Sequence, residues 1–137
     1  MTLRLLFLVF AFTSCSIPNL EPPECTESRG VVKEFYSFHF GNDMKFSQEN
    51  LKLREKFLTA EFTRSLQNIQ NENDVFTINS KDYPKAFRTG ACEVISTEKT
   101  IFTVVLFWRS DARSEQKEIK VETVKQNDKW LISKVIN

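Results

Sequence analysis

Residues 101–108, which read Ile-Phe-Thr-Val-Val-Leu-Phe-Trp, decide the fold of this chain. The stretch is rich in β-branched and aromatic residues, which is typical of a β-strand. Successive side chains of a strand point to opposite faces, and both faces are apolar here. One face carries Ile101, Val105 and Phe107, and the other carries Phe102, Val104, Leu106 and Trp108. We therefore predict a central strand that is covered on both sides, or one whose outer face meets a partner.

The segments around this strand predict an antiparallel meander. Residues 109–114 read as a turn, and Asn127-Asp128 is a hairpin signal between the last two strands. The expected strands are residues 75–78, 85–96, 101–108, 115–125 and 130–136. In the fourth of them Ile119, Val121 and Thr123 share one face, and in the last Trp130 and Ile132 lie on one face with Leu131 and Val135 near the other.

Three segments with helical spacing come before the strands. Apolar side chains spread over one broad face of residues 27–40, which predicts a long first helix. Ser47 is a candidate cap for a second, short helix that ends near Phe57, and Thr59 is a candidate cap for a third. The third helix would align Phe62, Leu66 and Ile69. Helices followed by an antiparallel sheet specify an α+β domain.

Two short motifs resemble parts of the nuclear-transport-factor-2-like superfamily, the α+β cone that ketosteroid isomerases share. Phe-Leu-Thr-Ala-Glu-Phe at residues 57–62 is similar to the junction of its second and third helices, and Trp-Leu-Ile-Ser-Lys-Val at 130–135 is similar to its last strand. The resemblance covers residues 27–137 and points to uncharacterised secreted families. It implies N-terminal helices packed on a curved antiparallel sheet. It implies no activity, because no catalytic residue of the isomerases matches this chain.

The amino terminus has the pattern of an export signal. One basic residue, Arg4, precedes the apolar run 5–12, and small residues follow. Phe-Thr-Ser-Cys at 12–15 resembles the lipobox of bacterial lipoproteins, which implies removal of residues 1–14 and acylation of Cys15, palmitate included. Ordinary signal cleavage is the alternative. With Ser16 in second place, the resemblance implies a periplasm-facing outer-membrane location if the envelope is Gram-negative.

Residues 15–26 contain Pro18, Pro22 and Pro23 and read as a tether between the anchor and the domain. Several acyl chains hold a protein stably at a membrane surface without spanning it. We expect the chain to be anchored in this way.

Composition excludes several classes of function. The chain has 137 residues and a net charge of +1, with no long basic run of the kind that nucleic-acid binding needs. Its three glycines form no phosphate-binding loop, so a nucleotide cofactor is not indicated. We predict no cofactor and no metal.

Cys25 and Cys92 are the only cysteines besides Cys15. They could form a disulfide in an oxidising compartment. Alternatively they are two unpaired thiols, and with no nearby histidine or further cysteine they do not indicate a zinc site. His39 is the only histidine, at the end of the first predicted helix, where backbone carbonyls and the helix dipole satisfy such a residue.

A candidate pocket is predicted from five residues around the cone, none of them assigned a catalytic role. They are Tyr36, Asp82, Tyr83, Arg88 and Trp108. The leading hypothesis is a non-enzymatic envelope lipoprotein that binds a small apolar ligand or a protein partner. One alternative is an isomerase or hydratase with a carboxylate such as Asp82 buried in the cone with a raised pKa. Another is an inhibitor or immunity protein of the envelope.

A homodimer is a further prediction. Phe102, Leu106 and Trp108 would need cover on the outer face of the sheet, and cone folds often pair through that face.

Overall fold

The computed structural model describes residues 20–137, so the predicted signal peptide and the lipidation of Cys15 lie outside the described residues. The helices are α1 (Pro23–Phe40), α2 (Gln48–Arg54), the 3-10 turn η1 (Glu55–Phe57) and α3 (Ala60–Leu66). The strands are β1 (Ala86–Ser96), β2 (Lys99–Ser110), β3 (Arg113–Gln126) and β4 (Lys129–Ile136). They form one antiparallel sheet in the order β1-β2-β3-β4. The α+β class predicted from the sequence is confirmed.

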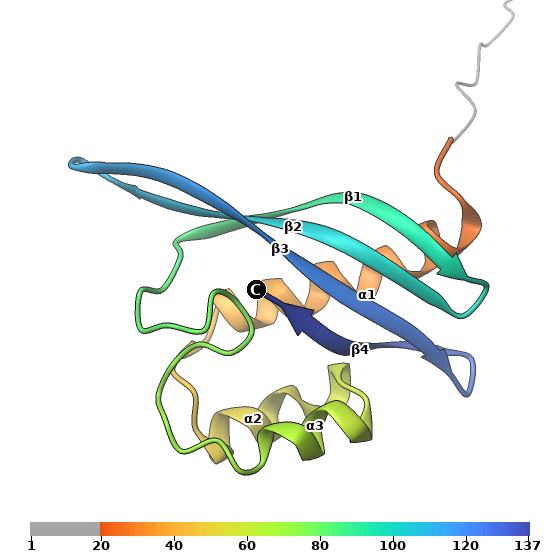
Figure 1. Ribbon diagram of the computed structural model, residues 1–137, viewed down its shortest axis with the longest axis horizontal. Coiled ribbons are helices and arrows are strands. Elements are labelled where there is room, and N and C mark those ends of the chain that lie inside the picture. The colour runs from red at the N-terminus through yellow and green to blue at the C-terminus, as the bar shows by residue number, and fades with distance from the viewer. Residues whose placement is uncertain (1–19) are drawn as a thin grey trace, which may run out of the picture.

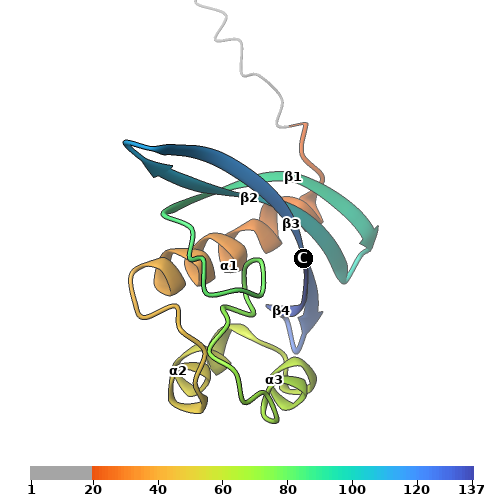
Figure 2. The same cartoon turned by 60° about the vertical axis from the view of Figure 1, so that its left-hand side comes forward.

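The sheet is long and curved, and α1 lies along its inner side (Figure 1). Turning the molecule shows α2 below α1 and α3 beside β4, with the 67–85 connection running back towards β1 (Figure 2). The inner face of β2 carries the predicted row Phe102, Val104, Leu106 and Trp108, all buried. These side chains join Phe35 of α1 in the main core. Among the described residues no helix is long and apolar enough to cross a membrane.

The first helix begins earlier than predicted. It starts at Pro23, where a missing N–H costs nothing because the first turn of a helix has no carbonyl to bind it. Glu24 in the first turn suits the positive end of the helix dipole. Residues 23–26 therefore belong to the domain and not to a tether, and the prolines that suggested a spacer include a helix start.

Both predicted helix caps are confirmed. Ser47 Oγ accepts a hydrogen bond from the N–H of Asn50 at 3.0 Å, and Thr59 Oγ1 accepts one from Phe62 at 3.1 Å. The third helix ends at Leu66, so Ile69 lies beyond it, although its side chain still packs against the core.

Residues 75–78 are a turn and not the predicted strand. A bridge joins Asp74 to Ser80, and the Asp74 carboxylate accepts from the N–H of Phe76 and from the hydroxyl of Thr77. An aspartate that bonds the backbone two residues on stabilises a turn. Asn79 closes it with a φ of 52°, in the left-handed region that asparagine tolerates.

The sheet departs from prediction at two more places. The turn between β2 and β3 is confined to residues 111–112, so both strands run further than expected. Pairing of β3 with β4 shifts between Glu122 and Thr123, and the bulge turns Val135 towards the core opposite Val121 instead of outward. The Asn127-Asp128 hairpin is as predicted, with φ angles of 51° and 61°.

The outer face of the sheet does not carry the residues on which the homodimer prediction was based. Phe102, Leu106 and Trp108 are buried in this chain's own core, and the outward residues of β2 are Ile101, Val105 and Phe107. Val105 lies between Arg88 of β1 and Glu118 of β3, and only 3% of it is exposed. Long charged side chains cover apolar surface with their stems. The homodimer stays a prediction.

Candidate functional site

The structure separates the five residues of the predicted pocket. Asp82, Tyr83 and Trp108 share a hollow of about 290 Å³ near the β2–β3 hairpin. Tyr36 is fully buried in the core, where its hydroxyl donates to the carbonyl of Phe76 at 2.8 Å. Burial, together with the nearby Asp74 charge, raises the pKa of Tyr36 well above its ordinary value. Arg88 is exposed beside Val105 on the outer face of the sheet.

Asp82 is held at the surface by Arg113. Two guanidinium N–H groups of Arg113 donate to the two Asp82 oxygens, each at 2.9 Å. The same guanidinium also binds Glu115 and lies 5.3 Å from the centre of the Trp108 ring. The hydrogen bonds from Arg113 lower the pKa of Asp82. Asp82 is exposed and its pKa is lowered, so the hypothesis of a buried Asp82 with a raised pKa inside the cone is wrong.

A second polar cluster lies inside the domain. His39 of α1 places Nε2 2.9 Å from Asp74 Oδ1, and Arg54 of α2 donates its Nε–H to His39 Nδ1 at 2.8 Å. Arg54 further donates to the backbone carbonyls of Asn50 and Asp43, both at 2.8 Å. Burial lowers the pKa of Arg54, and the Asp74 charge opposes that change.

This cluster joins α1, α2 and the turn that begins at Asp74, and it is not accessible to a substrate. The side chains of His39, Arg54 and Asp74 are at most 1% exposed, and each is bonded within the protein. The sequence singled out His39 and missed its two partners. Arg54 lies on the buried side of α2 three residues after Leu51, and that spacing was the available signal.

A groove of about 830 Å³ lies between α1, η1 and the β3–β4 hairpin. Its apolar residues are Val31, Phe57 and Trp130, one from each of these elements. The polar residues along it carry both signs of charge. They are Glu27, Lys33, Glu34, Ser37, Lys56, Asp128 and Lys129.

Polar contacts fix the walls of the groove. Trp130 donates its indole N–H to Glu27 Oε2 at 3.2 Å, and Lys125 binds the same oxygen at 3.2 Å. These bonds lower the pKa of Glu27 and keep it charged. Lys56 lies over the Phe57 ring at 4.9 Å and Lys129 reaches the Lys56 carbonyl at 3.4 Å. No local sequence pattern indicates this groove, because its residues come from three segments far apart in the chain.

Gly30 lines the groove in the middle of α1. A Cβ added there would meet no atom within 4 Å apart from the neighbouring backbone of its own helix, whereas one at Gly41 or Gly90 would lie 3.1 Å from a backbone oxygen. Glycine in a helix interior is destabilising by about 0.5–1 kcal/mol relative to alanine. The packing of this chain gives no reason for a glycine at position 30.

The described residues contain no cluster of three or more histidine, cysteine, aspartate or glutamate side chains that would hold a metal ion. No known family profile matches the sequence, and no curated protein matches it.

Solved structures do resemble the chain. One is a protein of unknown function from Bacteroides thetaiotaomicron VPI-5482, with a TM-score of 0.51 and 17% identity over 82% of this chain and 90% of that one. Another is described as an Ntf2 like protein involved in plasmid conjugation, with a TM-score of 0.50 and 17% identity over 99% of this chain and 48% of that one.

The chain has the nuclear-transport-factor-2-like fold. It spans about half the length, 48%, of the conjugation protein. At 17% identity these likenesses show the fold alone.

Aromatic rings fill the interior of this nuclear-transport-factor-2-like cone. The Phe35 ring lies 5.0 Å from Tyr36, 5.1 Å from Phe76 and 5.7 Å from Phe57, centre to centre. Phe102 and Trp108 pack into the same cluster from the sheet. The space that a small apolar ligand would need between α1 and the sheet is taken by these side chains.

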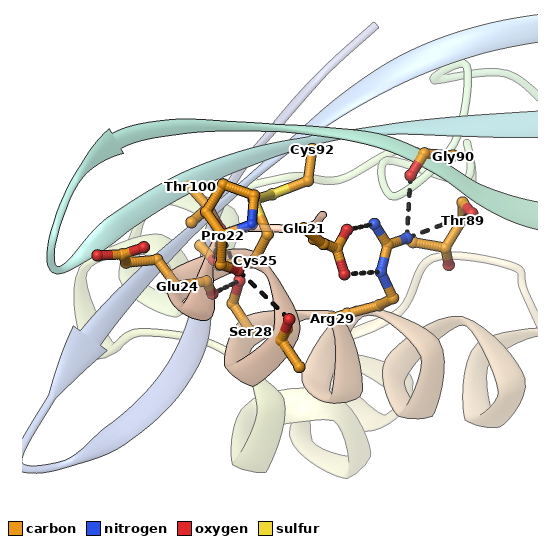
Figure 3. Close-up of a disulfide and its surroundings, with 12 residues drawn as sticks. Glu21, Pro22, Glu24, Cys25, Ser28, Arg29, Thr89, Gly90, Cys92 and Thr100 are labelled. Atoms are coloured by element: carbon orange, nitrogen blue, oxygen red, sulfur yellow. Dashed lines mark hydrogen bonds and ion pairs between the residues drawn. A yellow bond between two sulfur atoms is a disulfide. The ribbon is translucent and has the colours of Figure 1, made fainter. Parts of the chain in front are cut away.

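A disulfide between Cys25 and Cys92 joins the N-terminal end of α1 to β1, with the Cα atoms 6.0 Å apart (Figure 3). Beside it, Ser28 Oγ lies 2.8 Å from Thr100 Oγ1, which in turn lies 2.7 Å from Thr123 Oγ1. This chain of buried hydroxyls crosses from the helix to β2 and β3. The covalent and polar links together hold the start of the domain firmly against the sheet.

Proposed function

We propose that this protein is a lipid-anchored envelope protein whose domain binds another protein, without catalysis, through the groove beside Gly30. The anchor rests on the export pattern and on the lipobox-like residues 12–15. The observation that supports a binding role at the groove is Gly30 itself. A glycine that weakens its own helix and faces open space lets another backbone approach closely.

A protein partner fits the geometry better than a small apolar ligand. The cone interior is occupied by the rings around Phe35, whereas the groove lies on the surface along α1. Apolar side chains at its centre and charges of both signs around them resemble the core and rim of a protein interface.

Enzymatic function has less support. Of the carboxylates near the predicted pocket, Asp82 is exposed and paired with Arg113. The buried carboxylate, Asp74, is bonded to His39, Thr77 and the Phe76 N–H and is fully enclosed. The pKa of Asp82 is lowered and Asp74 has no access to a substrate, so neither carboxylate meets the requirements of a general base near neutral pH.

Photo-cross-linking in cells tests the binding role. A photoreactive amino acid in place of Ser37, which lines the groove, should form discrete cross-linked complexes of higher mass. The same photoreactive amino acid in place of Lys52, on the exposed side of α2, should form none. Gly30→Leu fills the groove and should abolish the products from position 37. Gly30→Ala adds only the Cβ that a closely approaching backbone would meet, and it should weaken these products. Equal products from both positions, or products that survive Gly30→Leu, would overturn the proposal.

The anchor has its own test. Cells grown with labelled palmitate should incorporate label into the natural chain and none into Cys15→Ser. The same substitution should move the protein out of the membrane fraction, since the proposed acyl chains are its hold on the bilayer. Label on the serine variant, or a natural chain that carries none, would contradict the anchor.

A further inference from the structure

Three exposed aliphatic side chains lie at the start of the described chain and near the end of β1. Leu20 is 89% exposed, Ile95 is 48% exposed and Val94 is 36% exposed. The start of the described chain and the β1–β2 hairpin lie at the same end of the molecule in both views (Figures 1 and 2). We call this end, with Leu20, Val94 and Ile95, the tether end.

The tether end is rigid. Cys92, two residues before Val94, is bonded to Cys25 of α1. Arg29 donates to the carbonyl of Gly90 in β1 at 2.9 Å and to the carboxylate of Glu21, next to Leu20 (Figure 3). The pairing register shifts twice along this part of β1, which leaves it irregular beside α1. The three aliphatic side chains are thus carried by segments that are fastened to each other.

The sequence limits how far the tether end lies from the proposed anchor. Cys15 and Leu20 are separated by five residue steps. An extended chain covers at most about 3.3–3.6 Å per residue, so these steps span about 17 Å. A lipid at Cys15 would therefore keep Leu20 within about half a bilayer thickness of the headgroups.

We propose that the tether end rests on the lipid bilayer, with Leu20, Val94 and Ile95 placed in the headgroup layer. This inference rests on the proposed lipid anchor. It adds an orientation: the sheet end with the disulfide faces the membrane, and α2 and α3 face away from it.

The charges around this surface select the kind of lipid. Glu93 and Glu98 lie on either side of Val94 and Ile95 in the chain, and Glu24 lies in the first turn of α1. The nearby cations already have acidic partners, since Arg29 binds Glu21 and Lys99 lies 3.7 Å from Glu122. Excess negative charge is repelled by anionic lipids. The tether end therefore fits a surface of zwitterionic lipids such as phosphatidylethanolamine.

The contact works only next to the anchor. Three partly exposed aliphatic side chains are too few to hold a free domain on a membrane, but a short linker makes the second contact intramolecular and raises its effective concentration. The acyl chains supply the attachment, and the tether end supplies the orientation.

Quenching by brominated phospholipids tests the contact. The acylated full chain is placed in phosphatidylethanolamine–phosphatidylcholine vesicles as Ile95→Trp, with Leu53→Trp as the matched control. Leu53 is an aliphatic residue of α2 that is 52% exposed. We expect brominated lipid to reduce the emission of Ile95→Trp and to leave Leu53→Trp at the level of the unsubstituted chain. Adding phosphatidylglycerol should weaken the quenching.

The outcomes separate the two proposals. If the acylated chain floats with the vesicles but neither variant is quenched, the anchor stands and the tether-end contact is overturned. If both variants are quenched equally, the proposed orientation is overturned. If mass spectrometry finds no acyl group on Cys15 and the chain does not float, the anchor fails and the contact that depends on it fails with it.

Discussion

Arg54 and His39 are joined by a hydrogen bond of 2.8 Å from the Arg54 Nε–H to Nδ1 of the imidazole, with both side chains buried. Because Nδ1 accepts this bond, the ring is neutral and carries its proton on Nε2, which faces Asp74. The neutral ring thus links a buried cation to a buried carboxylate. The three residues come from α2, from α1 and from the turn before β1, so the cluster holds the helical layer together.

Removing Arg54 should be strongly destabilising. Arg54→Ala leaves Asp74 without its cation inside the protein, and breaking a buried charge pair in this way costs about 3–5 kcal/mol. Urea denaturation followed by tryptophan fluorescence measures the loss. A change below about 1 kcal/mol, the scale of an exposed ion pair, would show that the cluster contributes little to folding.

Substitutions of His39 should separate its hydrogen bonds from its ring. His39→Gln offers an oxygen to Arg54 and an amide N–H to Asp74, so it should lose less stability than His39→Ala, which leaves both partners unsatisfied. Denaturation of the two variants side by side gives the comparison. Equal losses would mean that the stacking of His39 on Phe35, at 5.6 Å, matters more than the link.

The sequence predicted most of the secondary structure because its signals there are local. The caps at Ser47 and Thr59, the hairpin at Asn127-Asp128 and the alternation along residues 115–125 each depend on neighbours in the chain. The apolar faces of β2 were assigned correctly, but which face meets the helices was not. That choice depends on where α1 packs, and no residue of β2 encodes it.

Features set by distant contacts were missed. Residues 75–78 are hydrophobic enough for a strand, yet Asp74 bonds the Phe76 N–H and holds them in a turn, and the Asp74 side chain is itself held by His39 of α1. The groove needs α1, η1 and the last hairpin together, and its key residue, Gly30, is informative only once the space around it is known. The Cys25–Cys92 bond was open from sequence, since spacing alone does not bring two cysteines together.

The disulfide should make a large contribution to stability. Cys25 and Cys92 are 67 positions apart, and closing a loop of this length stabilises a fold by about 4 kcal/mol in the chain-entropy model, often less in practice. Cys25→Ser with Cys92→Ser should lower the denaturation midpoint accordingly. Reductant should destabilise the natural chain to the same extent and leave the double variant unchanged. A reductant effect on the double variant would contradict this assignment.

Gly30→Ala should make the protein more stable. The added methyl meets open space and the helix gains about 0.5–1 kcal/mol. Thermal melts of the full chain should show a rise in Tm, while Gly41→Ala, whose Cβ would press against the carbonyl of Ser37 at 3.1 Å, should show none. A fall in Tm for Gly30→Ala would remove the argument that this glycine serves something other than folding.

Acid should destabilise the protein in part through its surface carboxylates. Hydrogen bonds from Arg113 lower the pKa values of Asp82 and Glu115, and hydrogen bonds from Lys45 and Lys81 lower that of Glu72. A folded-state pKa below the unfolded value means that the unfolded chain binds protons first. Stability from these groups is therefore complete above the ordinary carboxyl pKa and is lost as pH falls through the folded pKa.

Arg113→Gln should flatten this acid dependence. Denaturation midpoints measured from about pH 6 down to about pH 3 should fall less steeply in the variant, because Asp82 and Glu115 then titrate nearer their ordinary values. Arg109→Gln is the matched control and should keep the natural slope. Arg109 lies on the other strand of the same hairpin, opposite Ser114, and has no ion pair in the described structure. Salt should reduce the difference, since exposed pairs are screened. Parallel pH curves for all three proteins would show that the Arg113 cluster does not contribute to acid stability.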